Sequence, residues 1–294
     1  MHHHTTRREN NHMRNEKGKL ICIWSPVLHG EGGSTLACLI GFGMQYYSGG
    51  RVLIVNKGNT VSHMEKYVEK DMDIRYSMDN LKIFNTGIKA EHILTYATKM
   101  NTGLYMIAGS RISKDITGEN SDFDRLFIDK CLEGFDIVIV DIDTGVRKEN
   151  RLYLDKADKI IAVLTPNEIV IDELYQNQGV KDVLDYFTDN KTVRIINKLY
   201  DGWEPGRVLG RYKSRYSLSN VFGLDYDGDI LNACCTERNL YSYTMNNIMH
   251  EKNKCAKQLN GICSFLISEL NIENKVCDVK HGGVFRRLVR SSLY

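Results

Sequence analysis

The chain has 294 residues, with 39 Lys or Arg against 37 Asp or Glu. This near-neutral balance lacks the excess positive charge typical of nucleic-acid-binding proteins, so DNA binding is disfavoured. No apolar run approaches the about 20 residues of a membrane-spanning helix, and the polar first twenty residues do not resemble a signal peptide. Because no Pro/Gly/Ser-rich linker divides the chain, we expect one large domain.

The two ends of the chain differ in composition from its middle. Residues 1–17 are rich in histidine, arginine and asparagine, and we expect a disordered N-terminal tail. Residues 18–272 are expected to form the folded domain, and residues 273–294 a C-terminal tail. The eight cysteines include no C-x-x-C pair, so neither a zinc cluster nor disulfides are expected. Several lie in apolar runs, which is typical of buried free thiols in a reducing cytoplasm.

Apolar segments and helical stretches alternate along the middle of the chain. Segments rich in Ile, Val and Leu predict strands at 20–24, 51–55, 81–84, 104–108, 135–140, 159–164 and 193–196. Helices are expected at 33–47, 61–70, 89–100, 121–132 and 168–187, and then at 230–236 and 239–271. Buried strands separated by helices indicate an α/β fold, a doubly wound, mostly parallel sheet flanked by helices on both faces.

A glycine-rich loop joins the first predicted strand to the first predicted helix, and its residues 29–35 read HGEGGST. Glycines let backbone N–H groups approach a polyphosphate, and the helix N-terminus adds a favourable dipole. A working phosphate-binding loop also has a lysine directly before its Ser or Thr. Here Ser34 holds that position, followed by Thr35. The sequence therefore predicts the shape of a nucleotide site without its main cation.

Polar residues also follow the carboxyl ends of three other predicted strands, at 56–58, 141–145 and 197–198. Ligands of α/β sheets bind at the carboxyl ends of the strands. These segments are therefore expected to meet the glycine-rich loop at one site.

The order of these motifs resembles that of ParA/MinD-type P-loop ATPases, whose loop reads KGGxGKT. Gly30, Gly33 and Thr35 match this pattern. His29 stands at the signature lysine, which in active members reaches the phosphates of a dimer partner, and Ser34 stands at the P-loop lysine. The resemblance covers roughly residues 18–270. It extends through an apolar strand closed by a carboxylate at 135–141, the "AD-x-apolar" strand at 157–166 and the strand at 193–198.

The resemblance implies a homodimer that binds ATP or ADP with Mg²⁺. Thr35 and Asp141 would hold the Mg²⁺, and Asp143 would lie in the second switch region, so that Asp141 and Asp143 are the catalytic candidates of an active enzyme. Asn197 would contact adenine. The implied nucleotide-binding residues are Gly30, Glu31, Gly32, Gly33, Ser34, Thr35, Asn197 and Lys198.

The replaced lysines make efficient hydrolysis improbable, because a cation on the β- and γ-phosphates stabilises the transferred phosphoryl group. Residues 211–227 are similar to a segment of the TadZ/CpaE branch, which contains atypical localisation factors of pilus assembly. We therefore expect a degenerate localisation or assembly scaffold with protein partners in a pilus, secretion or conjugation apparatus. The alternatives are an active partition-type ATPase with relocated catalytic residues and a DNA-binding partition or conjugation protein.

Three charged features bear on these alternatives. Glu31 would add a negative charge beside the phosphates and weaken their binding. Lys57 would either replace part of the missing positive charge or be a solvated surface residue. The basic run at 207–215 would be a solvated loop, or it would bind an acidic partner or DNA.

The last residues of the chain predict a short amphipathic helix after Gly282-Gly283. Its apolar face would contain Phe285 and Leu288, and its basic face is formed by Arg286, Arg287 and Arg290. This pattern is typical of membrane-surface anchors and resembles the C-terminal membrane-targeting helix of MinD-type proteins. It predicts peripheral association with anionic lipid at the inner face of the membrane. The alternatives are a helix packed on its own domain and a disordered tail.

Overall fold

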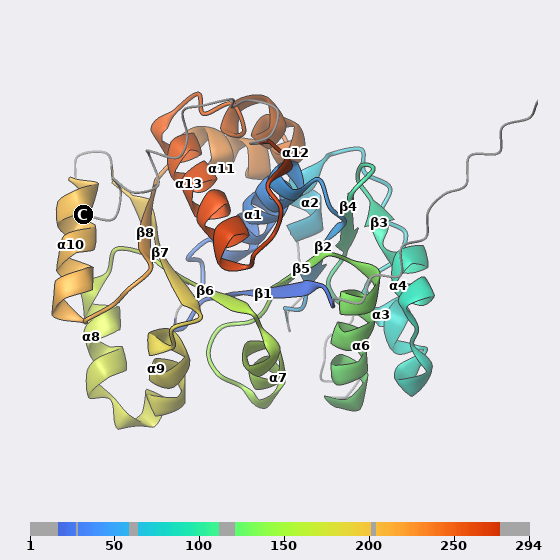
Figure 1. Ribbon diagram of the computed structural model, residues 1–294, viewed down its shortest axis with the longest axis horizontal. Coiled ribbons are helices and arrows are strands. Elements are labelled where there is room, and N and C mark those ends of the chain that lie inside the picture. Colours follow the sequence, from blue (N-terminus) through green and yellow to red (C-terminus); the bar gives the residue numbers. More distant parts are fainter. Residues whose placement is uncertain (1–16, 28, 59–63, 112–120, 201–203, 277–294) are drawn as a thin grey trace, which may run out of the picture.

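The computed structural model describes residues 17–27, 29–58, 64–111, 121–200 and 204–276. These residues form an eight-stranded sheet with helices on both faces (Figure 1). The strand order is β3-β4-β2-β5-β1-β6-β7-β8, in which β3 pairs antiparallel with β4 and the other pairs are parallel. The α/β fold class expected from the sequence is confirmed.

The strands of the sheet are β1 (Lys19–Trp24), β2 (Val52–Asn56), β3 (Thr98–Lys99), β4 (Leu104–Ile107), β5 (Ile137–Asp141), β6 (Lys159–Leu164), β7 (Thr192–Leu199) and β8 (Val221–Asp225). Successive side chains of a strand point to opposite faces, so the buried strands are apolar on both. In β1, for example, Ile21 and Ile23 contribute to one core, while Leu20, Cys22 and Trp24 contribute to the other. Burying each such side chain contributes about 1.5–3 kcal/mol.

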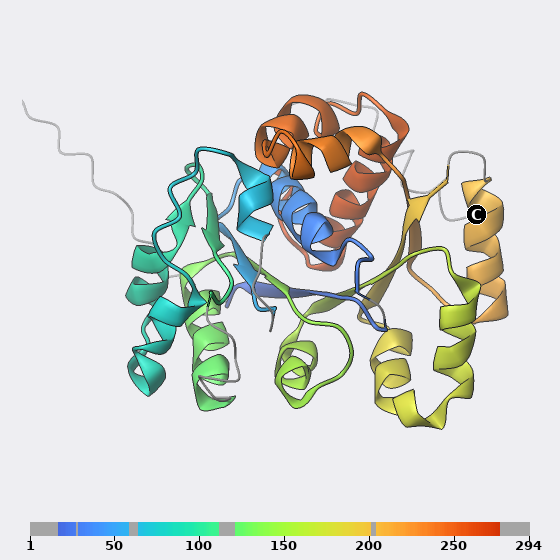
Figure 2. The same cartoon turned by 180° about the vertical axis from the view of Figure 1, so that it is seen from behind.

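Two layers of helices cover the sheet (Figures 1 and 2). One layer contains α1 (Gly33–Ser48), α2 (Met64–Val68), α11 (Gly228–Cys235), α12 (Leu240–Tyr243), the π-helical turn η3 (Thr244–Ile248) and α13 (Lys254–Glu269). The other contains α3 (Met78–Lys82), η1 (Asn85–Gly87), α4 (Ala90–Tyr96), α6 (Ser121–Gly134), α7 (Lys148–Lys156), α8 (Glu168–Gln176), η2 (Gln178–Val180), α9 (Lys181–Thr188) and α10 (Pro205–Arg215).

The strand predicted at 81–84 is wrong, because Leu81 and Lys82 end helix α3 and residues 83–84 form a turn. Ser77 caps α3, accepting a hydrogen bond from the Asp79 backbone N–H, and the Asn80 side chain accepts one from the Ser77 N–H. This reciprocal cap favours a helix start. The alternation of the short apolar segment is also absent, because Leu81 is buried while Ile83 is exposed.

Two of the predicted helices are each divided into shorter elements in the structure. The predicted helix at 168–187 is divided into α8 and α9, and the one at 239–271 into α12, η3 and α13. In both cases an asparagine interrupts the pattern: the Asn177 side chain accepts from the Gly179 N–H, and Asn253 caps α13. Asparagine side chains compete with helical backbone bonds in this way. The sequence pattern did not predict α7, α10, β3 or β8, and the helix expected at 89–100 ends at Tyr96, before β3.

No helix in the described ranges is long and apolar enough to cross a membrane. The described cysteines are free thiols, and they are Cys22, Cys38, Cys131, Cys234, Cys235, Cys255 and Cys263.

Candidate functional site

The segments expected to meet at the carboxyl ends of the strands do lie together. In the sheet, Asp141 at the end of β5 is paired with Ile23 of β1 on one side and with Asn56 of β2 on the other. A pocket of about 230 Å³ opens between the glycine-rich loop and these strand ends. Its lining residues are Ser25, His29, Gly30, Gly33, Ser34, Asn56, Gly58, Met64, Tyr67, Asp141, Ile142, Asp143 and Thr144. We refer to it as the loop pocket.

Two side chains at the end of β7 donate hydrogen bonds to the backbone of the glycine-rich loop. The Asn197 side-chain amide donates to the Glu31 carbonyl at 2.7 Å, and Lys198 Nζ donates to the Gly30 carbonyl at 2.6 Å. Gly32 has φ 95°, and a Cβ there would lie 2.6 Å from Asn197 Nδ2. Only glycine suits both the left-handed backbone and this close contact. Asn197 and Lys198 thus bind the loop itself.

The Glu31 side chain does not face the loop pocket, so the expectation that it places a charge beside the phosphates is wrong. Its carboxylate is 3% exposed, and Oε1 accepts hydrogen bonds from the backbone N–H and the hydroxyl of Thr165, both at 3.2 Å. Burial raises the pKa of this carboxyl group. Oε2 is buried without a hydrogen-bond partner in the described part of the chain. Glu31 therefore anchors the loop to the segment after β6.

Ser34, rather than Thr35, lies against Asp141. The Ser34 hydroxyl donates to Asp141 Oδ2 at 2.6 Å, whereas Thr35 Oγ1 lies 4.0 Å from the sulfur of Cys234, on the other side of the helix start. In P-loop proteins the loop Ser or Thr holds Mg²⁺ together with the carboxylate at the end of the second motif strand. The geometry thus transfers the predicted metal role from Thr35 to Ser34. A hydroxyl and a carboxylate in contact suit a hard cation such as Mg²⁺.

If Ser34 holds the Ser/Thr position of the P-loop motif, then Gly33 holds the position of the P-loop lysine. This alignment of the loop with the motif is shifted by one residue from the one that the sequence pattern suggested. A Cβ built on Gly33 would lie 3.4 Å from Ser25 Oγ and 3.7 Å from Asp141 Oδ1, so a side chain there would enter the loop pocket. The same shift moves the signature-lysine position from His29 to Leu28, which lies outside the described residues. The loop still lacks a lysine at both positions.

Lys57 does not compensate for the missing cation. It is buried, its Nζ lies 3.0 Å from Asp124 Oδ1 and 5.8 Å from the centre of the Tyr153 ring, and it does not line the loop pocket. Both earlier interpretations of Lys57, as a replacement cation and as a solvated residue, are therefore wrong. It pairs instead with the Asp124 carboxylate in the first turn of α6.

The segment after β5 is tied to the loop and to α7. The Asn150 amide donates to the carbonyls of Asp143 and Gly145, both at 2.9 Å, and Trp24 Nε1 also donates to Gly145 O at 2.9 Å. Thr144 Oγ1 lies 3.0 Å from His29 Nδ1 at the mouth of the pocket. These contacts hold the backbone of Asp143 at the edge of the loop pocket, which Asp143 lines.

Asp141 is the most perturbed acid of the site. It is 8% exposed, and burial raises its pKa to about 7, a shift that the Asp143 carboxylate increases and the Ser34 hydrogen bond opposes. Desolvation penalises the charged form of a carboxyl group, and a nearby like charge adds to the penalty. Within the described residues, no Lys or Arg lines the pocket, and no group of three or more His, Cys, Asp or Glu could hold a metal ion.

A second pocket, of about 250 Å³, lies on the other side of the loop, where the resemblance implies adenine. It is lined by Gly32, Thr35, Leu36, Leu39, Tyr67, Asn197, Lys198, Leu224, Asp225, Tyr226, Asp227, Ile230, Leu231, Cys234, Cys235 and Cys255. Gly32, Thr35, Asn197 and Lys198 of the predicted set thus line this mainly apolar pocket. Nothing in the sequence pattern marked α11 as its opposite wall, since that contact joins residues far apart in the chain.

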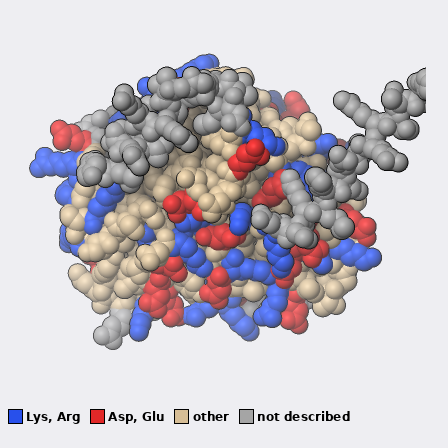
Figure 3. Space-filling model, in the orientation of Figure 1, with Lys and Arg blue, Asp and Glu red and all other residues tan. Residues whose placement is uncertain are grey.

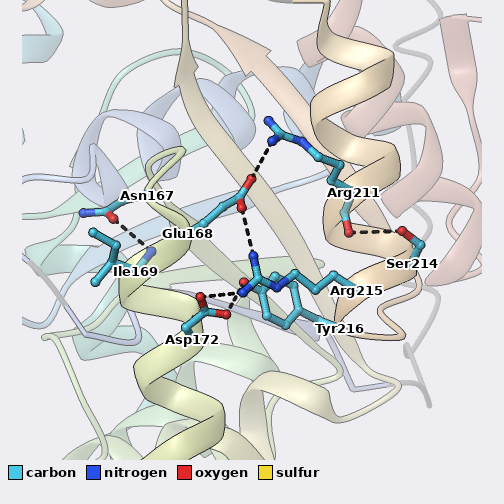
Figure 4. A network of polar contacts seen from close by, with 8 residues as sticks. All are labelled: Asn167, Glu168, Ile169, Asp172, Arg211, Ser214, Arg215 and Tyr216. Atoms are coloured by element: carbon cyan, nitrogen blue, oxygen red, sulfur yellow. Dashed lines mark hydrogen bonds and ion pairs between the residues drawn. The ribbon is translucent and has the colours of Figure 1, made fainter.

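The basic run at 207–215 is not a loop, and two of its arginines are neutralised. It forms most of α10, in which Arg211 and Arg215 pair with Glu168 of α8, and Arg215 also with Asp172 at 2.7 Å (Figure 4). Tyr212 is 1% exposed. Its i, i+4 spacing from the buried Val208 and Tyr216 is the signal that could have predicted this helix. Basic and acidic side chains also intermingle over the face shown in Figure 3.

The predicted membrane-binding residues Phe285, Arg286, Arg287, Leu288 and Arg290 lie outside the described residues.

No protein-family model matches the sequence, and no curated protein matches it. Solved structures do match its fold. They include a ParA family ATPase from Chlorobium tepidum TLS, with TM-score 0.65 and 14% identity over 84% of this chain and 98% of that one. The septum site-determining protein MinD from Pyrococcus horikoshii OT3, complexed with Mg-ADP, has TM-score 0.65 and 14% identity over 88% of this chain and 99% of that one. A plasmid partition protein from Borrelia burgdorferi has TM-score 0.59 and 13% identity over 86% of this chain and 100% of that one.

These structural neighbours are ParA/MinD-type ATPases, so the chain has the fold that its motifs resemble. At these identities the comparison shows the fold and not the activity.

Proposed function

We propose that this chain is a degenerate ParA/MinD-like protein that acts as a localisation or assembly scaffold and hydrolyses ATP weakly or not at all. The observation that supports this most directly is the loop pocket, where Gly33 takes the lysine position and the described lining holds Asp141 and Asp143 but no Lys or Arg. A polyphosphate would meet two carboxylates there, and no lysine of the described lining would offset them. Charged contacts of the missing kind contribute about 1.5–3 kcal/mol each.

Nucleotide binding is retained in this proposal as a weak property. The loop keeps its glycines and its helix N-terminus, which favour anions through backbone N–H groups. Ser34 and Asp141 would hold Mg²⁺, the charge of which would offset part of the phosphate repulsion. The proposal includes a homodimer with partners in a pilus, secretion or conjugation apparatus.

The rival function is an active partition-type ATPase, and it is supported by the fold match to a plasmid partition protein. It requires a cation from outside the described lining of the pocket. A DNA-binding role is disfavoured, because Glu168 and Asp172 neutralise Arg211 and Arg215 of the basic run.

ATP turnover by the purified protein is expected to be negligible, because the described lining of the loop pocket supplies no lysine to stabilise charge on the transferred phosphoryl group. Calorimetric titration with ATP and Mg²⁺ measures nucleotide binding, and a phosphate-release assay measures turnover. Together they distinguish a protein that only binds ATP from one that hydrolyses it and from one that does neither. Asp141→Ala is the matched control for contaminating activity. Steady phosphate release that survives repurification and is abolished by Asp141→Ala would contradict the proposal and support the partition-type ATPase.

We also propose that the C-terminal segment binds anionic membranes weakly. Each arginine near such a surface contributes about 1 kcal/mol, and burial of Phe285 and Leu288 contributes roughly 1.5–3 kcal/mol apiece. After the cost of ordering the segment, a monomer binds marginally, and a dimer gains from two anchors. Co-sedimentation with anionic vesicles should decrease with salt and with truncation at Gly283. Equal sedimentation of full-length and truncated protein at low salt would show that the anchor proposal is wrong.

A further inference from the structure

Tyr67 of α2 is the one residue that lines both pockets in the described part of the chain. Its helix packs against α1 and α11, and Arg238 Nε donates to the Lys66 carbonyl of that helix at 3.0 Å. Consecutive residues at the start of α1 open into different pockets, because Ser34 lines the loop pocket and Thr35 lines the second pocket. The two pockets are therefore neighbouring halves of one site around the start of α1, with Tyr67 at their junction.

The described linings of the two halves differ in their basic side chains. Lys198 lines the second pocket, whereas the loop pocket has no Lys or Arg in its described lining. The basic side chain described there is His29, which is exposed at the mouth, and the acids are Asp141 and Asp143. Each further phosphate that a ligand extends into the loop pocket therefore meets carboxylates and no Lys or Arg of this lining. Juxtaposed like charges weaken binding.

The second pocket suits an uncharged ring system. Its apolar lining comprises Leu36, Leu39, Leu224, Ile230 and Leu231. Its two carboxylates have partners of their own, since Lys254 Nζ lies 2.5 Å from Asp225 Oδ2 and Asp227 Oδ1 accepts from the Asp229 backbone N–H at 2.9 Å. Small ligands bind in concave, mainly apolar pockets that contain few polar groups.

We propose that this site selects a nucleoside with one phosphate over a nucleoside triphosphate, and that Tyr67 positions the sugar and that phosphate at the junction of the pockets. The base would occupy the second pocket. The phosphate would lie at the start of α1, where backbone N–H groups and the helix dipole favour an anion. The inference deepens the proposed weak nucleotide binding and rests on it.

The Tyr67 side chain can make two kinds of contact there. Its half-buried ring offers an apolar surface to a sugar, and its hydroxyl can donate a hydrogen bond to a phosphate oxygen. Burial raises the pKa of this phenol, and the Cys235 and Cys234 thiols add to the shift. The hydroxyl therefore stays protonated at neutral pH and remains a donor.

The first test compares AMP, ADP and ATP by calorimetric titration of the full-length protein in EDTA at constant ionic strength. AMP should bind at least tenfold more tightly than ATP, with ADP between them, because each added phosphate approaches the carboxylates of the loop pocket. Mg²⁺ should narrow the difference, since its charge offsets that of the phosphates. Gly33→Lys should reverse the order by supplying an ammonium group, whereas the matched Gly33→Met should still bind AMP more tightly than ATP.

The second test examines Tyr67 directly. Tyr67→Ala removes the ring and the hydroxyl and should weaken AMP binding about tenfold. Tyr67→Phe keeps the ring, so it keeps the test informative if Tyr67→Ala does not fold. It should weaken the binding of AMP but leave that of adenosine unchanged, because adenosine has no phosphate to accept from the hydroxyl. Tyr76→Ala removes an exposed ring that contacts Tyr96 and lines neither pocket, and it should bind AMP like the wild type.

Three results would overturn the inference. The first is a wild type that binds ATP in EDTA as tightly as AMP or more tightly, and the second is a wild type that binds none of the nucleotides. The third is AMP binding by both Tyr67 variants that equals that of Tyr76→Ala. The phosphate-release assay tests the proposed loss of turnover separately, so the two can fail independently.

Discussion

Replacing Gly33 with lysine is expected to raise the affinity for ATP with Mg²⁺ about ten- to hundredfold, because one charged contact to phosphate contributes about 1.5–3 kcal/mol. The backbone accepts this change, since Gly33 is the first residue of α1 and the nearest neighbours of a built Cβ lie at ordinary contact distances of 3.4 and 3.7 Å. The new ammonium group would enter the loop pocket. Calorimetric titration of the variant and the wild type measures the gain.

Two control variants define the register of the loop. Gly33→Met has a side chain of similar length without charge, and it should not gain affinity. Ser34→Lys removes the hydroxyl that donates to Asp141 Oδ2 and should not gain affinity either. If Ser34→Lys gains affinity and Gly33→Lys does not, then Ser34 occupies the lysine position and the register derived from the Ser34–Asp141 contact is wrong.

The Asp141→Asn variant is expected to be more stable than the wild type at pH 8, by about 1–3 kcal/mol, and the difference should shrink toward pH 5. Burial raises the pKa of Asp141 from 3.8 to about 7 in the folded protein. Between these values the folded state binds more protons than the unfolded state, so the wild type loses stability as pH rises through about 7. A tenfold change in proton affinity corresponds to about 1.4 kcal/mol.

Asparagine keeps the shape of the side chain and an oxygen that can accept from Ser34, but it does not ionise. Chemical denaturation gives the free energy of unfolding of both proteins at pH 5 and pH 8. The effect is the stability difference between variant and wild type at pH 8 minus the same difference at pH 5. Other groups at the pocket, chiefly Asp143 and His29, are common to both proteins. Asp185→Asn, which removes an exposed carboxylate on α9, is the control, and its effect should be similar at the two pH values. An Asp141→Asn variant that gains nothing at pH 8 relative to pH 5 would contradict the assignment.

The two predictions describe one property of the loop pocket. An ionised, buried carboxylate costs stability when no cation is paired with it, and the described lining of the pocket holds no Lys or Arg. Such costs are common where a site is built for a ligand. A lysine at position 33 should therefore stabilise the folded protein as well as bind phosphate. Both Gly33→Lys and Gly33→Met raise the helix propensity of this position, but only lysine adds a charge. The difference in stability between the two variants therefore measures the contribution of the charge.

The sequence by itself determined the α/β fold and the approximate location of the site. Runs of Ile, Val and Leu mark buried parallel strands wherever they occur, because such strands are covered on both faces and need no specific partner. The glycine-rich loop is equally local, since left-handed backbone at Gly30 and Gly32 is a property of those residues. The ends of β2, β5 and β7 then had to meet that loop, because parallel strands place their carboxyl ends at one edge.

Only the tertiary structure decided what the charged and hydroxyl groups do there. Glu31 turns to Thr165, 134 residues away, and Lys57 pairs with Asp124, while Ser34 takes the contact to Asp141 that the motif had assigned to Thr35. A loop sequence fixes which groups are available, but the direction of each side chain depends on partners brought near by folding. Buried polar groups almost always have a hydrogen-bond partner. The packing of the sheet determines which partner lies within reach of each group.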